Sequence, residues 1–341
     1  MLKTHKALKR RSSHCMIKGT RMLIDTSHRF LKRISDIYRV KKGAGDVLPL
    51  TVGIPRMFYY YIYPGLWETF FRELGMKPVV SGMSTAKTVE KASEISETEH
   101  CLPNKLFDAH LAELAGRVDM IFVPRVLATI KDHLSCPKFG PLPDAARADI
   151  ARVTEVLSID IDETSQPLSS SLMLLGKKLN MPKARTVSAV KTAISAMQEA
   201  RRKMDRPVRK KGRPYFLLAG HHYTIHDNFI AGPVLNKLQS MDVDVELISF
   251  SENTPEKSYI LWSTSNAIYH KLNTISADEY DGVIQLSVFN CGCDSMMMDT
   301  YRQLVREKNI PYMFLMIDEH SAQAGIDTRV EAFIDSLGWR K

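Results

Sequence analysis

Four of the five cysteines in this 341-residue chain stand where a helix or a turn is expected to begin. Cys101 lies two residues ahead of a proline and Cys136 lies directly ahead of one, while Cys291 and Cys293 follow an apolar run as Cys-Gly-Cys. Proline is tolerated in the first turn of a helix. A thiolate or an anionic cluster just before that turn is stabilised by the positive end of the helix dipole.

Spacing alone leaves several kinds of chemistry open for these cysteines. A structural zinc site usually combines two close Cys/His pairs, and only Cys291 and Cys293 are close, at a spacing shorter than the common knuckle. An iron–sulfur cluster also needs several thiolates, and the fold can gather them from distant segments. A cysteine nucleophile with a histidine base is a third possibility. Buried structural thiols are a fourth, since free cysteine is a common core residue.

Length and composition indicate a globular protein of two domains. With 44% apolar and 25% charged residues, the chain has the balance of a soluble protein. Its longest apolar runs are too short to span a bilayer, and the N-terminus lacks the apolar core of a signal peptide. Five cysteines, an odd number, argue against a disulfide framework. We therefore expect a cytoplasmic location and no membrane partner.

The net charge of +9 comes from the N-terminal segment. Residues 1–50 hold 13 Lys/Arg against 3 Asp, whereas the remainder holds 34 basic and 35 acidic residues. We predict that residues 1–47 form a disordered basic extension. The body of the chain carries no charge signature of nucleic-acid binding.

Apolar runs and helical patterns alternate along the rest of the chain, which is typical of parallel, doubly wound sheets. The sequence predicts two Rossmann-like α/β lobes, 48–143 and 213–341, joined by a helical connector, 144–212, with the site in the cleft between the lobes. The expected strands are 48–54, 77–80, 118–123, 215–219, 243–249, 281–289 and 311–317. The expected helices are 66–74, 85–95, 103–115, 144–153, 168–180, 183–203, 228–240, 255–271, 295–308 and 326–337.

Charged and polar residues follow several predicted strands, at the edge where such sheets bind ligands. Arg56 and Arg125 could hold a phosphate or a carboxylate, or simply close their loops. His221 follows the strand 215–219 and is a candidate cofactor neighbour, although histidines at such places often only shape loops. Asp294 or Ser295 could cap the helix expected to start at 295.

The triplet Asp318-Glu319-His320 follows the last expected strand. Glu319 and His320 are candidate catalytic residues, because a carboxylate and an imidazole can act as acid and base. Helix capping and a salt link to Arg329 would explain the same triplet without catalysis.

The motifs resemble a known family. Two of the segments that carry the resemblance are residues 99–105, Glu-His-Cys-Leu-Pro-Asn-Lys, and 289–294, Phe-Asn-Cys-Gly-Cys-Asp. Further matching segments are 52–56, 70–75, 105–107, 121–125, 136–139, 219–221, 317–320, 324–325 and 329–333. Together they cover about 51–338 and resemble the acyl-CoA dehydratase activase-related family (CoA enzyme activase-like), related to the cluster-bearing components of 2-hydroxyacyl-CoA dehydratases.

This resemblance implies that Cys101, Cys136 and Cys291 bind a [4Fe-4S] cluster between two Rossmann-like lobes, with one iron open. The sequence departs from the family at Asn290 and Cys293, where Gly and Pro are expected. Cys293 is therefore either a fourth ligand that closes the cluster or a bystander.

The lysines that follow two of the cysteines, Lys105 and Lys138, could offset the charge of a thiolate-bound cluster, or be ordinary loop lysines. The implied partners are an ATP-dependent activase or a second dehydratase-like subunit, and an acyl-CoA substrate. No Gly-x-x-x-x-Gly-Lys-Ser/Thr motif is present, so we do not expect this chain to be the ATPase.

The expected function is low-potential electron transfer, or reductive or radical dehydration of an acyl-CoA-type substrate. Two alternatives remain. One is a non-catalytic [4Fe-4S]-binding or scaffold protein, and the other is a zinc- or ligand-binding α/β protein without redox activity.

Overall fold

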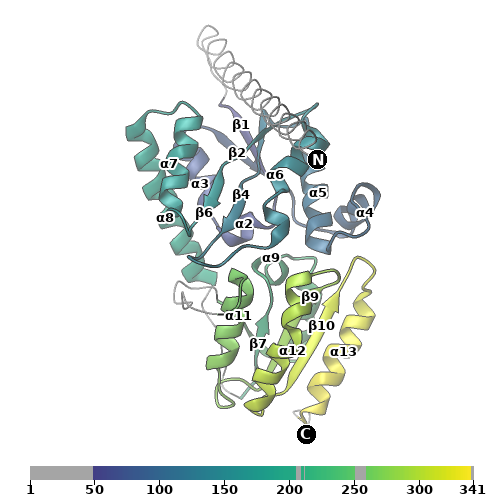
Figure 1. Cartoon of the computed structure of the whole chain (residues 1–341). Helices are drawn as coiled ribbons and strands as arrows, with labels where there is room; N and C mark the ends of the chain where they lie inside the picture. Colours follow the sequence, from purple (N-terminus) through teal and green to yellow (C-terminus); the bar gives the residue numbers. More distant parts are fainter. Residues whose placement is uncertain (1–48, 205–208, 211, 250–258, 339–341) are drawn as a thin grey trace, which may run out of the picture.

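Two four-stranded parallel sheets form the cores of two lobes (Figure 1). The structure is a computed structural model that describes residues 49–204, 209, 210, 212–249 and 259–338. The predicted extension 1–47 and part of the helix expected at 255–271 lie outside these residues. The α/β fold class with two doubly wound lobes is confirmed.

Both sheets have the same strand order. The first runs β2 (Lys77–Val80), β1 (Thr51–Ile54), β3 (Met120–Phe122), β5 (Glu155–Leu157), and the second runs β8 (Asp244–Leu247), β7 (Tyr215–Ala219), β9 (Gly282–Val288), β10 (Tyr312–Ile317). Counted along the chain within each four-stranded sheet, both orders are 2-1-3-4, and all neighbouring strands are parallel. In such a sheet, ligands bind at the carboxyl ends of the two central strands, where the order reverses.

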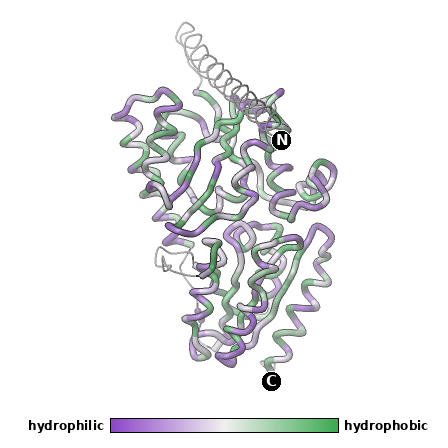
Figure 2. The backbone as a smooth tube through the Cα atoms, viewed as in Figure 1, coloured by the Kyte–Doolittle hydropathy of each residue, from purple (hydrophilic) through white to green (hydrophobic). Residues whose placement is uncertain are grey.

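The helices lie on the outside of the two sheets and are joined to the strands by loops (Figure 1). Those of the first half are α2 (Tyr59–Ile62), α3 (Leu66–Glu73), α4 (Ala86–Ile95), α5 (Leu102–Leu114), the 3₁₀ helix η1 (Pro137–Phe139), α6 (Leu142–Ile150), α7 (Leu168–Lys178) and α8 (Lys183–Met204). Those of the second half are α9 (His222–Ile225), α10 (Gly232–Ser240), α11 (Ser263–Thr274), α12 (Gly292–Glu307) and α13 (Gln323–Ser336). Figure 2 shows polar and apolar residues alternating along α13, as expected of a surface helix.

The segment 144–212 contains strands as well as the three expected helices. β5 lies within it and completes the first sheet, and β6 (Asp160–Asp162) pairs with β4 (Arg125–Ala128) in a separate two-stranded sheet. These strands have three or four residues each, too few to give a recognisable hydrophobic period.

Each lobe has a buried apolar core. Every residue of β7 and of β9 is buried, as expected for parallel strands covered on both faces. In the first lobe, Trp67 and Phe71 of α3 pack against Phe122 of β3, with ring centroids 4.7 and 5.2 Å apart. No helix among the described residues is long and apolar enough to cross a membrane.

The two lobes meet where α2 packs against α9. The Phe58 ring of the first lobe lies edge-on to Tyr223 of α9, with centroids 5.0 Å apart, and Phe139 of η1 lies 5.9 Å from the same tyrosine. This aromatic contact brings the carboxyl end of β7 against the loops that follow the first sheet. The four predicted cysteines lie next to this aromatic contact.

Candidate metal centre

Three of the four predicted cysteines occupy the residue immediately before a helix. Cys101 is the N-cap of α5, Cys136 the N-cap of η1 and Cys291 the N-cap of α12. The prediction that Cys101 precedes a helix is confirmed, and the proline in the first turn of α5 is the reason. None of the three side chains caps its own helix. Each sulfur is therefore placed at the positive end of a helix without being used by it.

The start of α12 differs from the prediction. The helix begins at Gly292 and not at Ser295, so neither Asp294 nor Ser295 is its cap. Cys293 lies in the first turn and is buried, with 4% of its surface exposed. Asn290, just before the cap, has a positive φ of 62°, which turns the chain from β9 into the helix.

The four cysteines converge on the lobe interface. The side chains of Cys136 from the first lobe and Cys293 from the second share a hydrogen bond. The Lys138 ammonium lies 3.7 Å from the Cys101 sulfur. Burial raises the pKa of Tyr223 well above its usual value, and all four thiols raise it further because they lie close to its hydroxyl.

The surroundings of the thiols shift their pKa values in different directions. The pKa of Cys136 is lowered to about 6. A hydrogen bond from Cys293 has the largest effect, and the Lys138 backbone amide and the nearby charges of His221 and Lys138 add to it. Together they outweigh burial, which would raise the pKa. The same hydrogen bond and burial raise the pKa of Cys293. Burial also raises the pKa of Cys101, although the Lys138 charge opposes it. Among Cys101, Cys136 and Cys293, Cys136 is therefore the thiolate, and Cys293 donates to it.

This difference predicts selective alkylation. In metal-free protein at pH 7, iodoacetamide should react with Cys136 faster than with Cys101 or Cys293, because the thiolate is the nucleophile. The rate at Cys136 should fall as the pH drops through about 6, where its thiolate becomes protonated. Peptide mass spectrometry of samples quenched at several times measures each rate. A midpoint near the value of a free cysteine, about 8.5, would contradict the assignment.

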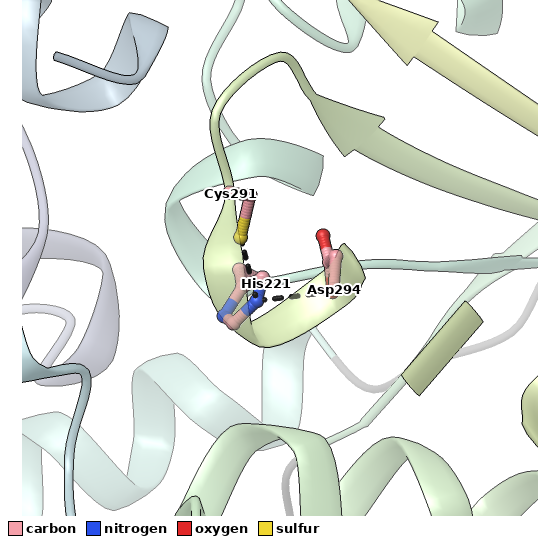
Figure 3. A group of neighbouring side chains, drawn as sticks. All are labelled: His221, Cys291 and Asp294. Atoms are coloured by element: carbon pink, nitrogen blue, oxygen red, sulfur yellow. Dashed lines mark hydrogen bonds and ion pairs between the residues drawn. The ribbon is translucent and has the colours of Figure 1, made fainter. Parts of the chain in front are cut away.

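His221, Cys291 and Asp294 form a tight group on the second lobe (Figure 3). His221 follows β7 as the N-cap of α9, while Cys291 and Asp294 follow β9, so the group sits at the carboxyl ends of the two central strands. His221 Nε2 lies 3.2 Å from Asp294 Oδ1 and 3.7 Å from Cys291 Sγ. The ligand atoms of all three lie within 4.8 Å of one another, so the group can hold a metal ion.

The pKa values of His221 and Asp294 are set mainly by the attraction between their opposite charges. Burial alone would lower the pKa of His221, but Asp294 and Cys291 hold it well above its usual value. Burial would raise the pKa of Asp294, but His221 and the Ser287 hydroxyl, which donates to Asp294 Oδ2 over 2.6 Å, hold it below its usual value. Sequence reasoning missed Asp294 as part of the site. Its place three residues after Cys291, in the first turn of a helix, was the available signal.

The residues predicted around the cluster take different roles. Lys105 of α5 forms an ion pair with Glu319, and both side chains are largely buried. Burial would raise the pKa of Glu319, but its hydrogen bond with Lys105 keeps the pKa below its usual value. This contact joins the two lobes, and Glu319 pairs with Lys105 and not with Arg329, the partner named in one of the alternatives. His320 is exposed, and its backbone amide donates to Asp318 over 3.0 Å.

Both predicted arginines make contacts inside the first lobe. Arg56 donates to the Ser81 carbonyl and to the Tyr60 hydroxyl, each over 3.0 Å. Arg125 donates to the Gly140 carbonyl and to Asp144, and lies 3.3 Å from Asp160. These contacts fit the loop-closing alternative for both residues.

Fold and site together define a two-lobed α/β protein whose lobes meet at a group of thiols with a His–Cys–Asp group beside it. The chain belongs to the family described as CoA enzyme activase uncharacterised domain (DUF2229), which matches residues 51–249. This confirms the resemblance found in the motifs. No curated protein sequence matches the chain.

Comparison with solved structures gives weak similarities only. ZnuA is 9% identical at a TM-score of 0.24, over 85% of this chain and 99% of that one. The laminin-binding protein Lbp of Streptococcus pyogenes is 8% identical at 0.25, over 85% and 99%. The Zn(II)-bound ZnuA-like domain of Streptococcus pneumoniae AdcA is 10% identical at 0.26, over 85% and 98%. At these scores, nothing about ligand or function follows for this chain.

Proposed function

We propose that this chain is an iron–sulfur protein whose cluster is held by Cys101, Cys136 and Cys291, with Cys293 as the candidate fourth ligand. The observation that carries the proposal is the convergence of these four thiols from both lobes on one place. Cysteines brought together from segments up to 192 residues apart are not explained by local packing. Family membership supports the same assignment.

The donor set fits an anionic, thiolate-bound centre. Three sulfurs stand at helix N-termini, whose amides and dipoles stabilise negative charge. Lys138 beside Cys101 and the charged His221 beside Cys291 add positive charge. A [4Fe-4S] cluster bound here would supply one-electron chemistry at low potential. The chain's own part is to hold the sulfurs, keep the site dry and, through His221, donate a hydrogen bond toward Cys291.

The partners follow from this assignment. A low-potential cluster needs a strong reductant, so we propose an ATP-dependent activase or a second dehydratase-like subunit as the electron donor. An acyl-CoA-type compound is the proposed substrate of reductive or radical dehydration. A non-catalytic cluster-binding role would use the same cysteines.

Anaerobic reconstitution tests the proposal. The full chain, incubated with iron, sulfide and reductant without oxygen, should become brown and contain about four iron and four sulfide per chain. Electron paramagnetic resonance of the reduced protein should show a cluster signal. A colourless protein without bound iron after reconstitution would refute the proposal.

Cys293 determines whether the cluster is closed. If Cys293 is a ligand, Cys293→Ser should keep most of the iron but change the resonance spectrum, because an iron loses a thiolate. If Cys136, Cys101 and Cys291 suffice, the variant's spectrum and iron content should equal those of the wild type. Adding an acyl-CoA to both proteins completes the comparison, since only an open iron can bind its carbonyl oxygen.

A single metal ion at His221, Cys291 and Asp294 is the second candidate, favoured by their separations. Atoms 3.2 and 3.7 Å apart match ligands that surround one tetrahedral ion at about 2.0–2.3 Å. Such a centre would make the chain a zinc- or ligand-binding protein without redox activity.

Asp294→Asn separates the two candidates. The amide is a poor zinc ligand but keeps the shape of the side chain. If zinc is bound by this group, zinc affinity should fall roughly 10-fold or more, whereas a cluster held by thiolates should keep its iron. Inductively coupled plasma mass spectrometry after parallel loading with zinc and iron measures both. Equal zinc binding by the variant and the wild type would exclude the His–Cys–Asp centre.

A further inference from the structure

A cavity between the two lobes lies apart from the cysteines. It has a volume of about 350 Å³, and none of the four described cysteines lines it. One wall comes from the first half of the chain: the end of α2, the segments that follow β4 and β6, and helices α7 and α8. The opposite wall comes from the second lobe, where His222 of α9 and the start of α11 line the cavity. A ligand held here would contact both lobes at once.

Two charged side chains of opposite sign line this interlobe cavity. Arg201 of α8 donates to the Ile62 carbonyl over 3.0 Å and has no carboxylate partner in the described part of the chain. Glu163, which follows β6, accepts a hydrogen bond from the Tyr63 hydroxyl over 3.3 Å. Burial raises the pKa of Tyr63 well above its usual value, the Glu163 charge adds to this rise, and the Arg201 charge opposes it. Both charges therefore act close to the Tyr63 hydroxyl.

The interlobe cavity thus holds both signs of charge and has no net charge. The third titratable group with a charge near neutral pH would be His222, but burial and the nearby Arg201 lower its pKa well below the usual value, so it stays neutral. A ligand that is only an anion is attracted by Arg201 and repelled by Glu163, and the reverse holds for an amine. A ligand with a carboxylate and an ammonium close together can pair with both residues, through charge-assisted hydrogen bonds.

An apolar surface lies beside these charges. Ile194 and Met197 line the cavity from the same face of α8 as Arg201, because residues three or four apart lie together on a helix. Leu168 at the start of α7 and Ala267 of α11 add to this surface. Ile194 precedes Arg201 by seven residues, which is about 10 Å along the helix axis. This length suits a charged head group at Arg201 with an apolar chain of a few carbons directed toward Ile194.

We propose that the interlobe cavity binds a free α-amino acid with an apolar side chain, its carboxylate at Arg201, its ammonium at Glu163 and its side chain against Ile194. Ligand pockets span about 300–1,000 Å³, and a cavity of about 350 Å³ suits a molecule of this size and not a nucleotide or a coenzyme. The site is separate from the proposed metal centre, and the inference does not rest on the proposed function. Because the ligand contacts both lobes, its binding stabilises their docked arrangement.

Isothermal titration calorimetry of the metal-free full-length protein tests the proposal. L-Isoleucine is the probe that carries both charges and an apolar chain. Of its analogues, 3-methylpentanoate lacks the ammonium, 2-methylbutylamine lacks the carboxylate, and glycine lacks the chain. L-Isoleucine should bind at one site per chain and raise the urea midpoint. Each analogue should bind roughly 10-fold more weakly or worse, because each loses one of the three sets of contacts.

Variants on both sides of the ligand assign its groups. Glu163→Gln should weaken L-isoleucine binding roughly 10- to 100-fold, as expected for a lost charged hydrogen bond, and should strengthen binding of 3-methylpentanoate by removing the repulsion. Ile194→Trp should abolish binding by filling the cavity. Val187→Trp is the matched control, because it adds the same ring to α8 at an exposed position outside the cavity. Ala267→Leu fills the cavity from α11 and serves if Ile194→Trp does not fold.

Three results would overturn the proposal. The first is the absence of both a heat of binding and a rise in the urea midpoint with millimolar L-isoleucine in the wild type. The second is equal affinity for L-isoleucine and 3-methylpentanoate, which would show that no ammonium is recognised. The third is equal L-isoleucine binding by Ile194→Trp, or by Ala267→Leu in its place, and Val187→Trp. Iron reconstitution is measured separately, so its failure would refute the cluster and leave these results standing.

Discussion

The Cys101→Ser variant is expected to lose the proposed iron–sulfur cluster and keep its fold. The serine hydroxyl is a poor ligand for cluster iron, and Cys101, the N-cap of α5, is a proposed ligand from the first lobe. The side chain is 9% exposed and the exchange of sulfur for oxygen leaves no large cavity. If Cys293 is not a ligand, two thiolates remain, and iron after anaerobic reconstitution should fall from about four per chain to well below one; if Cys293 is a ligand, the resonance spectrum should change instead. The circular dichroism spectrum and the urea midpoint of the metal-free protein should stay near those of the wild type.

Two control variants test whether the loss of iron is specific to Cys101. Cys15→Ser removes the one cysteine outside the described residues and should keep the full iron content. Lys138→Ala removes the ammonium 3.7 Å from the Cys101 sulfur but no ligand, so it should keep iron. Wild-type iron content together with an unchanged resonance spectrum in Cys101→Ser would show that Cys101 is a buried structural thiol, the simplest alternative from the sequence.

Much of the fold could be predicted because its elements carry local signals. Gly75, with a positive φ of 78°, ends α3 where the sequence predicts, and β2 and β7 have their predicted bounds. Glycine supplies the left-handed conformation after a helix at little cost. Short strands such as β4 and β6 carry no such signal, because their pairing with each other, and not their own pattern, defines them.

The site was predictable only in part. A proline two residues on indicated that Cys101 precedes a helix, and the strand ends indicated where His221 and Cys291 lie. The pairing of His221 with Asp294 was not predictable, because it depends on the adjacency of β7 and β9 and on α12 starting three residues early. The Lys105–Glu319 ion pair joins residues 214 positions apart, and nothing local specifies it.

A second large effect is expected from Asp227→Ala at the junction of the lobes. Asp227 is fully buried in the loop after α9. Its Oδ2 accepts hydrogen bonds from the Ser84 hydroxyl over 2.5 Å and from the Tyr61 hydroxyl over 3.2 Å, both of the first lobe. Its Oδ1 accepts from the backbone amides of Phe229 and Ile230. Removing the carboxylate leaves several buried donors unpaired, so the free energy of unfolding should fall by about 3–5 kcal/mol.

Urea unfolding of the metal-free protein, followed by circular dichroism, measures this loss. Asp227→Asn should fall between the wild type and Asp227→Ala, because its amide oxygen can still accept while its NH₂ group cannot. Glu199→Ala is the control: Glu199 pairs with the exposed Arg202 and Lys203 of α8, and its removal should leave the midpoint unchanged. A loss in Asp227→Ala no larger than that in Glu199→Ala would contradict the role of the junction.

The same variant connects lobe docking to the metal centre. Burial of Asp227 raises the pKa of its carboxyl, and the hydrogen bonds from Ser84, from two backbone amides and from Tyr61 limit this rise. Because Ser84 and Tyr61 belong to the first lobe, the charged form of Asp227 is favoured by contact between the lobes. Cys101 and Cys136 belong to one side of this contact, and Cys291 and Cys293 belong to the other. If the lobes separate first when Asp227 is removed, the chain should lose iron at a urea concentration below that at which its helices unfold. In the wild type, iron release and helix unfolding should coincide, because the docked lobes hold both.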